Sequence, residues 1–124
     1  MVDMLFVGGG GFLGANARYF LGRWIAERYG GEFPYGTMFI NVSGSLIIGF
    51  VLTVLAARSG LSPNYRLLVA VGFLGAYTTF STYTYDGLTM MRADEWLKSL
   101  VYLTASVVMG MAAVTAGMLL GRRV

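Results

Sequence analysis

The sequence predicts an all-α integral membrane protein, and three observations support this. Only 12% of the 124 residues are charged, against about 25% in an ordinary soluble domain. Hydrophobic residues make up 56% of the chain, and the mean hydropathy is +0.67. Ten of the 15 charged residues fall outside four long apolar stretches. Because too little polar surface remains to coat a soluble globule, we expect residues 1–124 to form one domain in the lipid bilayer.

The four apolar stretches are each long enough to cross a membrane. A helix needs about 20 residues to span about 30 Å of hydrocarbon. Short connections rich in turn-forming residues separate the stretches, and Pro34 and Pro63 stand just ahead of the second and third, where a proline can precede a helix. We therefore expect transmembrane helices over residues 4–25, 36–57, 66–91 and 97–119.

The basic residues divide evenly between the two sides of the predicted bundle. Four spans put both termini and the second loop on one side, with Arg58, Arg66, Arg122 and Arg123. The other side carries Arg23, Arg28, Arg92 and Lys98. An excess of Lys and Arg normally fixes orientation, so neither orientation is favoured here. The even count arises either from an error in one helix boundary or from insertion in both orientations, with assembly as an antiparallel homodimer.

The first and second spans contain small and polar residues in helical register. Gly10 and Gly14 have the spacing typical of tight helix packing. Arg18 follows one turn later and either snorkels to the interface or attracts an anion. Asn41 lies on one face of the second span with Thr37 and is either an interhelical hydrogen-bond partner or a donor facing a pore.

The third span concentrates glycine, hydroxyl, aromatic and carboxylate side chains near the middle of the membrane. Gly75 and the β-branched pair Thr78 and Thr79 make a continuous helix doubtful there. Interrupted spans commonly mark ion sites, because unwound carbonyls and helix ends are free to bind. Packing alone would have to satisfy five hydroxyl groups in this stretch, so we favour an interrupted third helix that contributes to an ion path.

Aromatic and hydroxyl side chains next to this interruption favour an anion as the ion. Phe80 and Tyr83 share a helix face, and the edge of an aromatic ring carries partial positive charge. Tyr102 and Ser106 add hydroxyls one turn apart on the fourth span. Aromatic residues at helical spacing are more often core, but the polar neighbours favour a path that binds an anion without trapping it.

Several function classes are excluded by composition. With no Cys and no His, the chain has no thiolate, imidazole base or zinc site. No paired carboxylates, nucleophile–base pair or phosphate-binding loop is present, so we do not expect an enzyme. The net charge of +3 includes no run of adjacent Lys or Arg, and no nucleic-acid partner is expected.

Three motifs resemble the Fluc/CrcB family of small bacterial fluoride channels. These are GANARY at residues 14–19, GTMFINVSG at 36–44, and GFLG followed by TTFSTY within 72–83. The resemblance implies a fluoride-selective passive ion channel that exports fluoride from the cytoplasm. It also implies a multi-pass protein of the bacterial cytoplasmic (inner) membrane, assembled as an antiparallel, dual-topology homodimer with two pathways.

The resemblance also assigns roles to individual residues. A structural sodium ion at the dimer centre would be held by the backbone carbonyls of Gly75 and Thr78, which are hard oxygen ligands. Arg18 would attract anions into a vestibule that Asp86 helps to line. The fluoride pathway would comprise Asn41, Phe80, Tyr83, Ser81, Thr82, Thr37, Tyr102 and Ser106.

Two positions depart from the family pattern. Tyr83 stands where phenylalanine is usual and adds a hydroxyl to the ring. Asp86 stands where glutamate is typical and is one methylene shorter.

Two other functions are compatible with four short spans. A small multidrug-type proton-coupled exporter also has dual topology, but it needs a membrane-embedded carboxylate, and the first span has none after Asp3. A structural subunit without transport activity is disfavoured by the polar middle of the third span.

Overall fold

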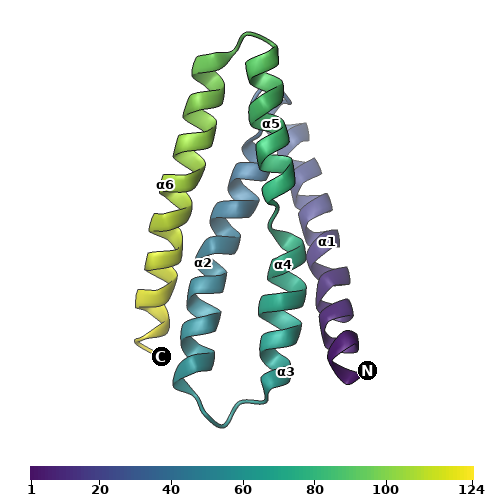
Figure 1. Cartoon of the computed structure of the whole chain (residues 1–124), viewed down its shortest axis with the longest axis vertical. Coiled ribbons are helices and arrows are strands. Elements are labelled where there is room, and N and C mark those ends of the chain that lie inside the picture. Colours follow the sequence, from purple (N-terminus) through teal and green to yellow (C-terminus); the bar gives the residue numbers. More distant parts are fainter.

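A computed structural model describes all 124 residues and contains only helices and their connections (Figure 1). Three of its four long segments are continuous helices: α1 (Val2–Tyr29), α2 (Tyr35–Ala57) and α6 (Trp96–Gly121). The remaining segment consists of α3 (Pro63–Tyr65), η1 (Arg66–Leu74), α4 (Gly75–Tyr77) and α5 (Phe80–Arg92). The all-α prediction is confirmed, and several helices extend past the predicted spans by one to four residues, as expected where a helix continues into the polar interface.

Three of the four segments are long and apolar enough to cross a membrane. They are Tyr35–Ala57, Pro63–Arg92 and Trp96–Gly121, with mean hydropathies of 2.1, 1.2 and 1.9. The first predicted span, residues 4–25, is the exception. It lies within the 28-residue helix α1, but the glycines of α1, together with Asn16 and Arg18, make it less apolar than the other three segments. This segment is therefore less apolar than expected, although it is long enough to cross a membrane.

The segments pack in two close pairs, α2 with α6 and α1 with η1. The two termini lie at the same end of the bundle, together with the loop after α2 (Figure 1). Glycines allow these close contacts: a Cβ on Gly14 would overlap the Phe73 carbonyl oxygen in η1, and one on Gly117 would overlap the Leu46 oxygen in α2. The prediction that Gly14 serves helix packing is confirmed, and Gly117 makes a second contact of the same kind.

The third segment changes conformation between α4 and α5. Thr78 (φ −82°, ψ 158°) and Thr79 (φ −149°, ψ 122°) have extended backbone. Gly75 is helical (φ −62°, ψ −34°), so of the three residues expected at the interruption, only Thr78 and Thr79 depart from the helix. The β-branched threonines adopt extended backbone readily, and Thr79 also caps α5, its Oγ1 accepting a hydrogen bond from the Thr82 N–H at 3.2 Å.

The core of the single chain is small. Only 17 of the 124 residues are buried, and Ile40, Leu74 and Tyr77 form the main cluster. These three side chains hold α2 against the segment that precedes the extended threonines. Most of the apolar surface is left for contact with lipid or with another protein chain.

Candidate functional site

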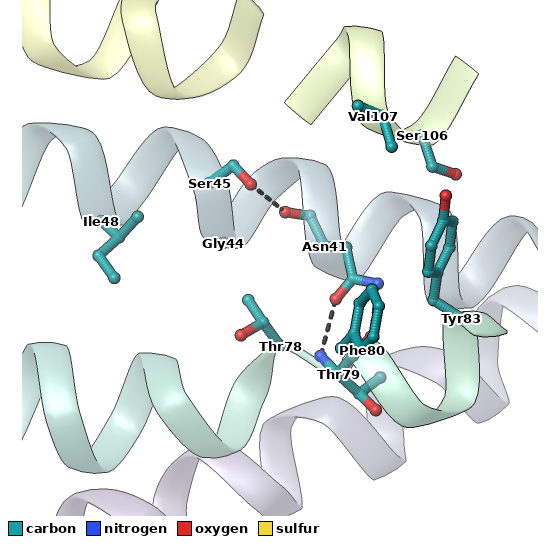
Figure 2. A pocket seen from close by; sticks show the side chains of 10 residues that line it. All are labelled: Asn41, Gly44, Ser45, Ile48, Thr78, Thr79, Phe80, Tyr83, Ser106 and Val107. Carbon is teal, nitrogen blue, oxygen red and sulfur yellow. Dashed lines mark hydrogen bonds between the residues drawn. The ribbon is translucent and has the colours of Figure 1, made fainter. Parts of the chain in front are cut away.

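A pocket of about 310 Å³ lies beside the extended threonines (Figure 2). Side chains from α2, α5 and α6 and from the extended pair surround it. The lining residues are Asn41, Gly44, Ser45, Ile48, Thr78, Thr79, Phe80, Tyr83, Ser106 and Val107. The structure therefore brings together four predicted pathway residues, Asn41, Phe80, Tyr83 and Ser106, although they come from three different helices.

Both polar atoms of the Asn41 side-chain amide form hydrogen bonds with the backbone of Thr79. Its Nδ2 donates to the Thr79 carbonyl at 2.9 Å, and its Oδ1 accepts from the Thr79 N–H at 2.8 Å. The structure therefore shows the hydrogen bonding between segments that was the first alternative for Asn41, and the second alternative, a donor facing a pore, stays a prediction. A primary amide has two N–H donors, so one donor is left over after this pairing.

The two aromatic side chains of the site stand next to each other at the start of α5. The ring centroids of Phe80 and Tyr83 are 5.9 Å apart, with planes tilted by 39°. Phe80 is 77% exposed in the single chain. The Tyr83 hydroxyl donates to the Leu103 carbonyl of α6 at 2.8 Å. The hydroxyl that distinguishes this position from the family pattern is therefore used to attach α5 to α6.

We expect Tyr83→Phe to lower stability more than transport. Removing the hydroxyl deletes one hydrogen bond, worth about 1 kcal/mol, but it leaves the ring and its edge in the pocket. Ion flux through liposomes should stay within about threefold of the unchanged protein, while the thermal unfolding temperature falls by a few degrees. A loss of flux with unchanged stability would show that the hydroxyl acts in the pathway itself.

Thr37, Asp86 and Tyr102 form a separate polar cluster beside the pocket. Thr37 Oγ1 donates to Asp86 Oδ2 at 3.0 Å, and the Tyr102 hydroxyl donates to the same oxygen at 3.4 Å. Tyr102 is fully buried, and its ring packs against those of Phe33 and Tyr83, with centroids 5.6 and 5.4 Å away. None of the three lines the first pocket.

A second pocket, of about 490 Å³, lies between α1, α2 and α5. Arg18 and Asp86 both line it, so the two predicted vestibule residues face one cavity, together with Thr37 and Thr82. Thr79 lines both pockets. The backbone to which Asn41 is bonded therefore separates the two cavities.

Three of the predicted hydroxyls differ in their surroundings. Ser81 and Thr82 are exposed in the single chain, and both contact Thr79 Oγ1, at 3.3 and 3.0 Å. Ser81 lines neither pocket. Ser106 Oγ is buried and has no hydrogen-bond partner. Leaving a buried hydroxyl without a hydrogen bond costs free energy. A ligand in the pocket could supply the missing partner of Ser106.

The carbonyls of Gly75 and Thr78 have lost the amide donors that a continuous helix would supply. In an α-helix their partners would be the N–H groups of Thr79 and Thr82, four residues later. The Thr79 N–H donates to Asn41 Oδ1 instead, and the Thr82 N–H donates to Thr79 Oγ1. The Thr78 hydroxyl is occupied, since it donates to the Leu74 carbonyl at 3.0 Å. Backbone carbonyl oxygens freed in this way are suitable ligands for a small hard cation.

Sequence reasoning missed Thr79 as a site residue. Its side chain caps α5 and its backbone pairs with Asn41. The available signal was its position immediately before a polar helix start, where threonine is a preferred cap. Ser45, which donates to the Asn41 carbonyl at 2.7 Å, also lines the pocket and lies one helical turn after Asn41.

The fold and the site together define a small multi-pass helical membrane protein with a polar pocket beside an interrupted helix. The family model described as CrcB-like protein, Camphor Resistance (CrcB), matches residues 5–118. The chain belongs to this family, which confirms the resemblance drawn from the three motifs.

Curated relatives extend over nearly the whole chain. A protein of Acidobacterium capsulatum is 48% identical over 97% of this chain and 96% of its own length. One from Rhizobium meliloti is 42% identical over 98% of each chain, and one from Chloroflexus aurantiacus is 43% identical over 98% and 97%. All three carry the name fluoride-specific ion channel FluC. Because these relatives are ion channels, the expectation that the chain is not an enzyme is confirmed.

Proposed function

We propose that the protein is a passive, fluoride-selective channel that exports fluoride from the bacterial cytoplasm across the inner membrane. The observation that carries this proposal is the pocket beside Thr78 and Thr79, which combines an amide, two aromatic rings and an unpaired hydroxyl. No charged side chain lines it. A dehydrated anion can therefore be stabilised there without being trapped by a full opposite charge. The names of the relatives supply fluoride as the ion.

Fluoride sheds its water as it enters the pocket and exchanges it for protein donors. The spare Nδ2 hydrogen of Asn41, the Ser106 hydroxyl and the ring edges of Phe80 and Tyr83 provide those donors. Arg18 attracts anions into the second cavity, and the hydroxyls there connect the cavity with the pocket. A narrow path of closely spaced donors disfavours the larger chloride ion.

The channel assembles as an antiparallel, dual-topology homodimer with two equivalent pathways. The equal number of basic residues on the two sides supports insertion in both orientations. The 77% exposure of Phe80 in the single chain also supports a partner, because a pore needs walls on all sides. Two-fold symmetry then produces two copies of each pathway.

A structural sodium ion joins the two subunits at the centre of this dimer. The carbonyls of Gly75 and Thr78 fit the ion, because both lack their helical amide donors. Two carbonyls from each subunit provide four hard oxygen ligands. Gly75 is exposed in the single chain, which leaves it accessible to a second copy. The ion itself supplies only electrostatic cohesion between the subunits.

The test is anion efflux from liposomes containing the purified protein. Fluoride efflux should exceed that of protein-free liposomes by orders of magnitude, whereas chloride efflux should stay near background. Liposomes with the same lipid and a heat-inactivated sample are the control. Equal permeation of fluoride and chloride, or no permeation of either, would contradict the proposal.

A further inference from the structure

Two side chains accept hydrogen bonds from the Thr79 and Thr82 N–H groups. In a continuous helix these amides would donate to the carbonyls of Gly75 and Thr78. Asn41 Oδ1 accepts from the Thr79 N–H at 2.8 Å, and Thr79 Oγ1 accepts from the Thr82 N–H at 3.2 Å. We infer that Asn41 and Thr79 are positioning residues for the cation site, since each keeps one ligand carbonyl free. This inference rests on the structural sodium of the proposed function.

Loss of the Asn41 acceptor changes the balance of hydrogen bonds at this point. The partly buried Thr79 N–H then needs another acceptor, because an unpaired amide in this environment is costly. The acceptor nearest along a helix is the Gly75 carbonyl, one turn earlier. Closing that turn directs the Gly75 oxygen along the helix axis toward Thr79, so the oxygen is no longer available to a cation.

The second half of the Asn41 contact fixes the same geometry from the other side. Asn41 Nδ2 donates to the Thr79 carbonyl at 2.9 Å, so the amide holds both polar groups of one peptide residue. Paired hydrogen bonds of this kind set orientation as well as distance. The extended conformation of Thr79 (φ −149°, ψ 122°) is thereby held by a side chain from α2.

The cap of α5 acts in the same way on the Thr78 carbonyl. Thr79 Oγ1 satisfies the Thr82 N–H at the start of α5, which is the usual role of an N-cap threonine. Without that hydroxyl, the Thr82 amide is left without its acceptor and can extend the helix back to Thr78. A different side chain therefore keeps each of the two carbonyls free of its helical hydrogen bond.

This arrangement links the anion pocket to the cation site through one residue. Asn41 lines the pocket and has a spare Nδ2 hydrogen there, while its Oδ1 controls the Gly75 carbonyl. Ser106 lines the same pocket but makes no side-chain hydrogen bond to the extended threonines. Substitution of Asn41 should therefore affect the sodium response, whereas substitution of Ser106 should affect the pocket alone.

The experiment measures sodium-dependent stabilisation of the purified full-length protein rather than flux. Thermal unfolding is followed by circular dichroism as sodium chloride replaces potassium chloride at constant ionic strength, because a ligand that binds the folded state raises its stability by mass action. Asn41→Leu keeps the side-chain size but removes the acceptor, and it should raise the sodium concentration for half-maximal stabilisation by about tenfold, which corresponds to about 1.4 kcal/mol. Thr79→Val should raise it similarly.

Two variants serve as matched controls. Thr79→Ser keeps the capping hydroxyl and should retain a midpoint within about twofold of the unchanged protein. Ser106→Ala removes a polar group from the pocket without touching the extended threonines, and it should also leave the sodium midpoint unchanged. If Asn41→Leu does not fold, the difference between Thr79→Val and Thr79→Ser decides the question.

The outcomes separate this inference from the proposed function. Unchanged sodium midpoints in folded Asn41→Leu and Thr79→Val would overturn the inference, and so would the absence of any sodium-specific stabilisation of the unchanged protein. Higher sodium midpoints in Asn41→Leu and Thr79→Val, together with a near-normal midpoint in Thr79→Ser, support it. That result would support it even if the liposome assay detected no fluoride selectivity, in which case the proposed transport function alone would fail.

Discussion

Phe80→Ile is expected to lower fluoride efflux from liposomes by at least about a hundredfold while the protein remains folded. The Phe80 ring lines the pocket next to Tyr83, and its edge offers partial positive charge to an anion that has lost its water. Isoleucine has a similar apolar size but no polarised edge. A hundredfold loss corresponds to about 2.7 kcal/mol at the barrier, which is reasonable for the loss of one stabilising group around a desolvated ion.

The control for this prediction is Phe12→Ile on α1. Phe12 is 70% exposed in the chain and lines neither polar pocket, so its replacement should leave efflux unchanged. Circular dichroism and a single elution peak in detergent would establish that both variants are folded. Normal fluoride efflux in Phe80→Ile would remove the aromatic ring from the proposed mechanism.

The helices were predictable because their signal is local. Apolar composition over more than 20 residues places α2 and α6 within a few residues of their observed bounds. The helix α1 shows the limit of this reasoning, since glycines that reduce its hydropathy are the residues that allow it to approach η1. High hydropathy favours contact with lipid, whereas Gly10 and Gly14 lie against the backbone of η1.

Part of the membership of the site was predictable from the sequence, but the contacts between its residues were not. Helical periodicity correctly grouped Phe80 with Tyr83 and identified Asn41 as the polar residue in the middle of α2. Which backbone atom Asn41 contacts depends on the register between α2 and the third segment. That register is set by tertiary packing, such as the close fit of Gly44 against the methyl group of Thr78, and one sequence does not reveal it.

Hydrogen bonds between residues far apart in the sequence also could not be predicted. Thr37 was expected on one polar face with Asn41, but it bonds to Asp86, 49 residues away in the chain. The Tyr102 hydroxyl donates to the same carboxylate, and the place of Tyr102 on the pathway stays a prediction. The interruption was expected at Gly75, Thr78 and Thr79; the extended backbone lies at the two threonines, where Asn41 supplies substitute hydrogen bonds.

Gly14→Ala is expected to lower stability strongly. An added Cβ would overlap the Phe73 carbonyl oxygen, which belongs to the backbone of η1 and cannot rotate away as a side chain would. The helices must separate, and overpacking of this kind typically costs about 1–3 kcal/mol. We expect the thermal unfolding temperature in detergent to fall by roughly 10 °C.

Gly9→Ala provides the matched control on the same helix. No atom lies within 4 Å of a Cβ built at Gly9, and alanine favours a helix by about 1 kcal/mol over glycine, so this variant should be as stable as the unchanged protein or slightly more stable. Equal losses in the two variants would mean that the contact between α1 and η1 is not what Gly14 provides. If only Gly14→Ala loses stability, we also expect this variant to respond less to sodium. Phe73 lies two residues before Gly75, so a shift of η1 also moves the predicted ligand carbonyl of Gly75.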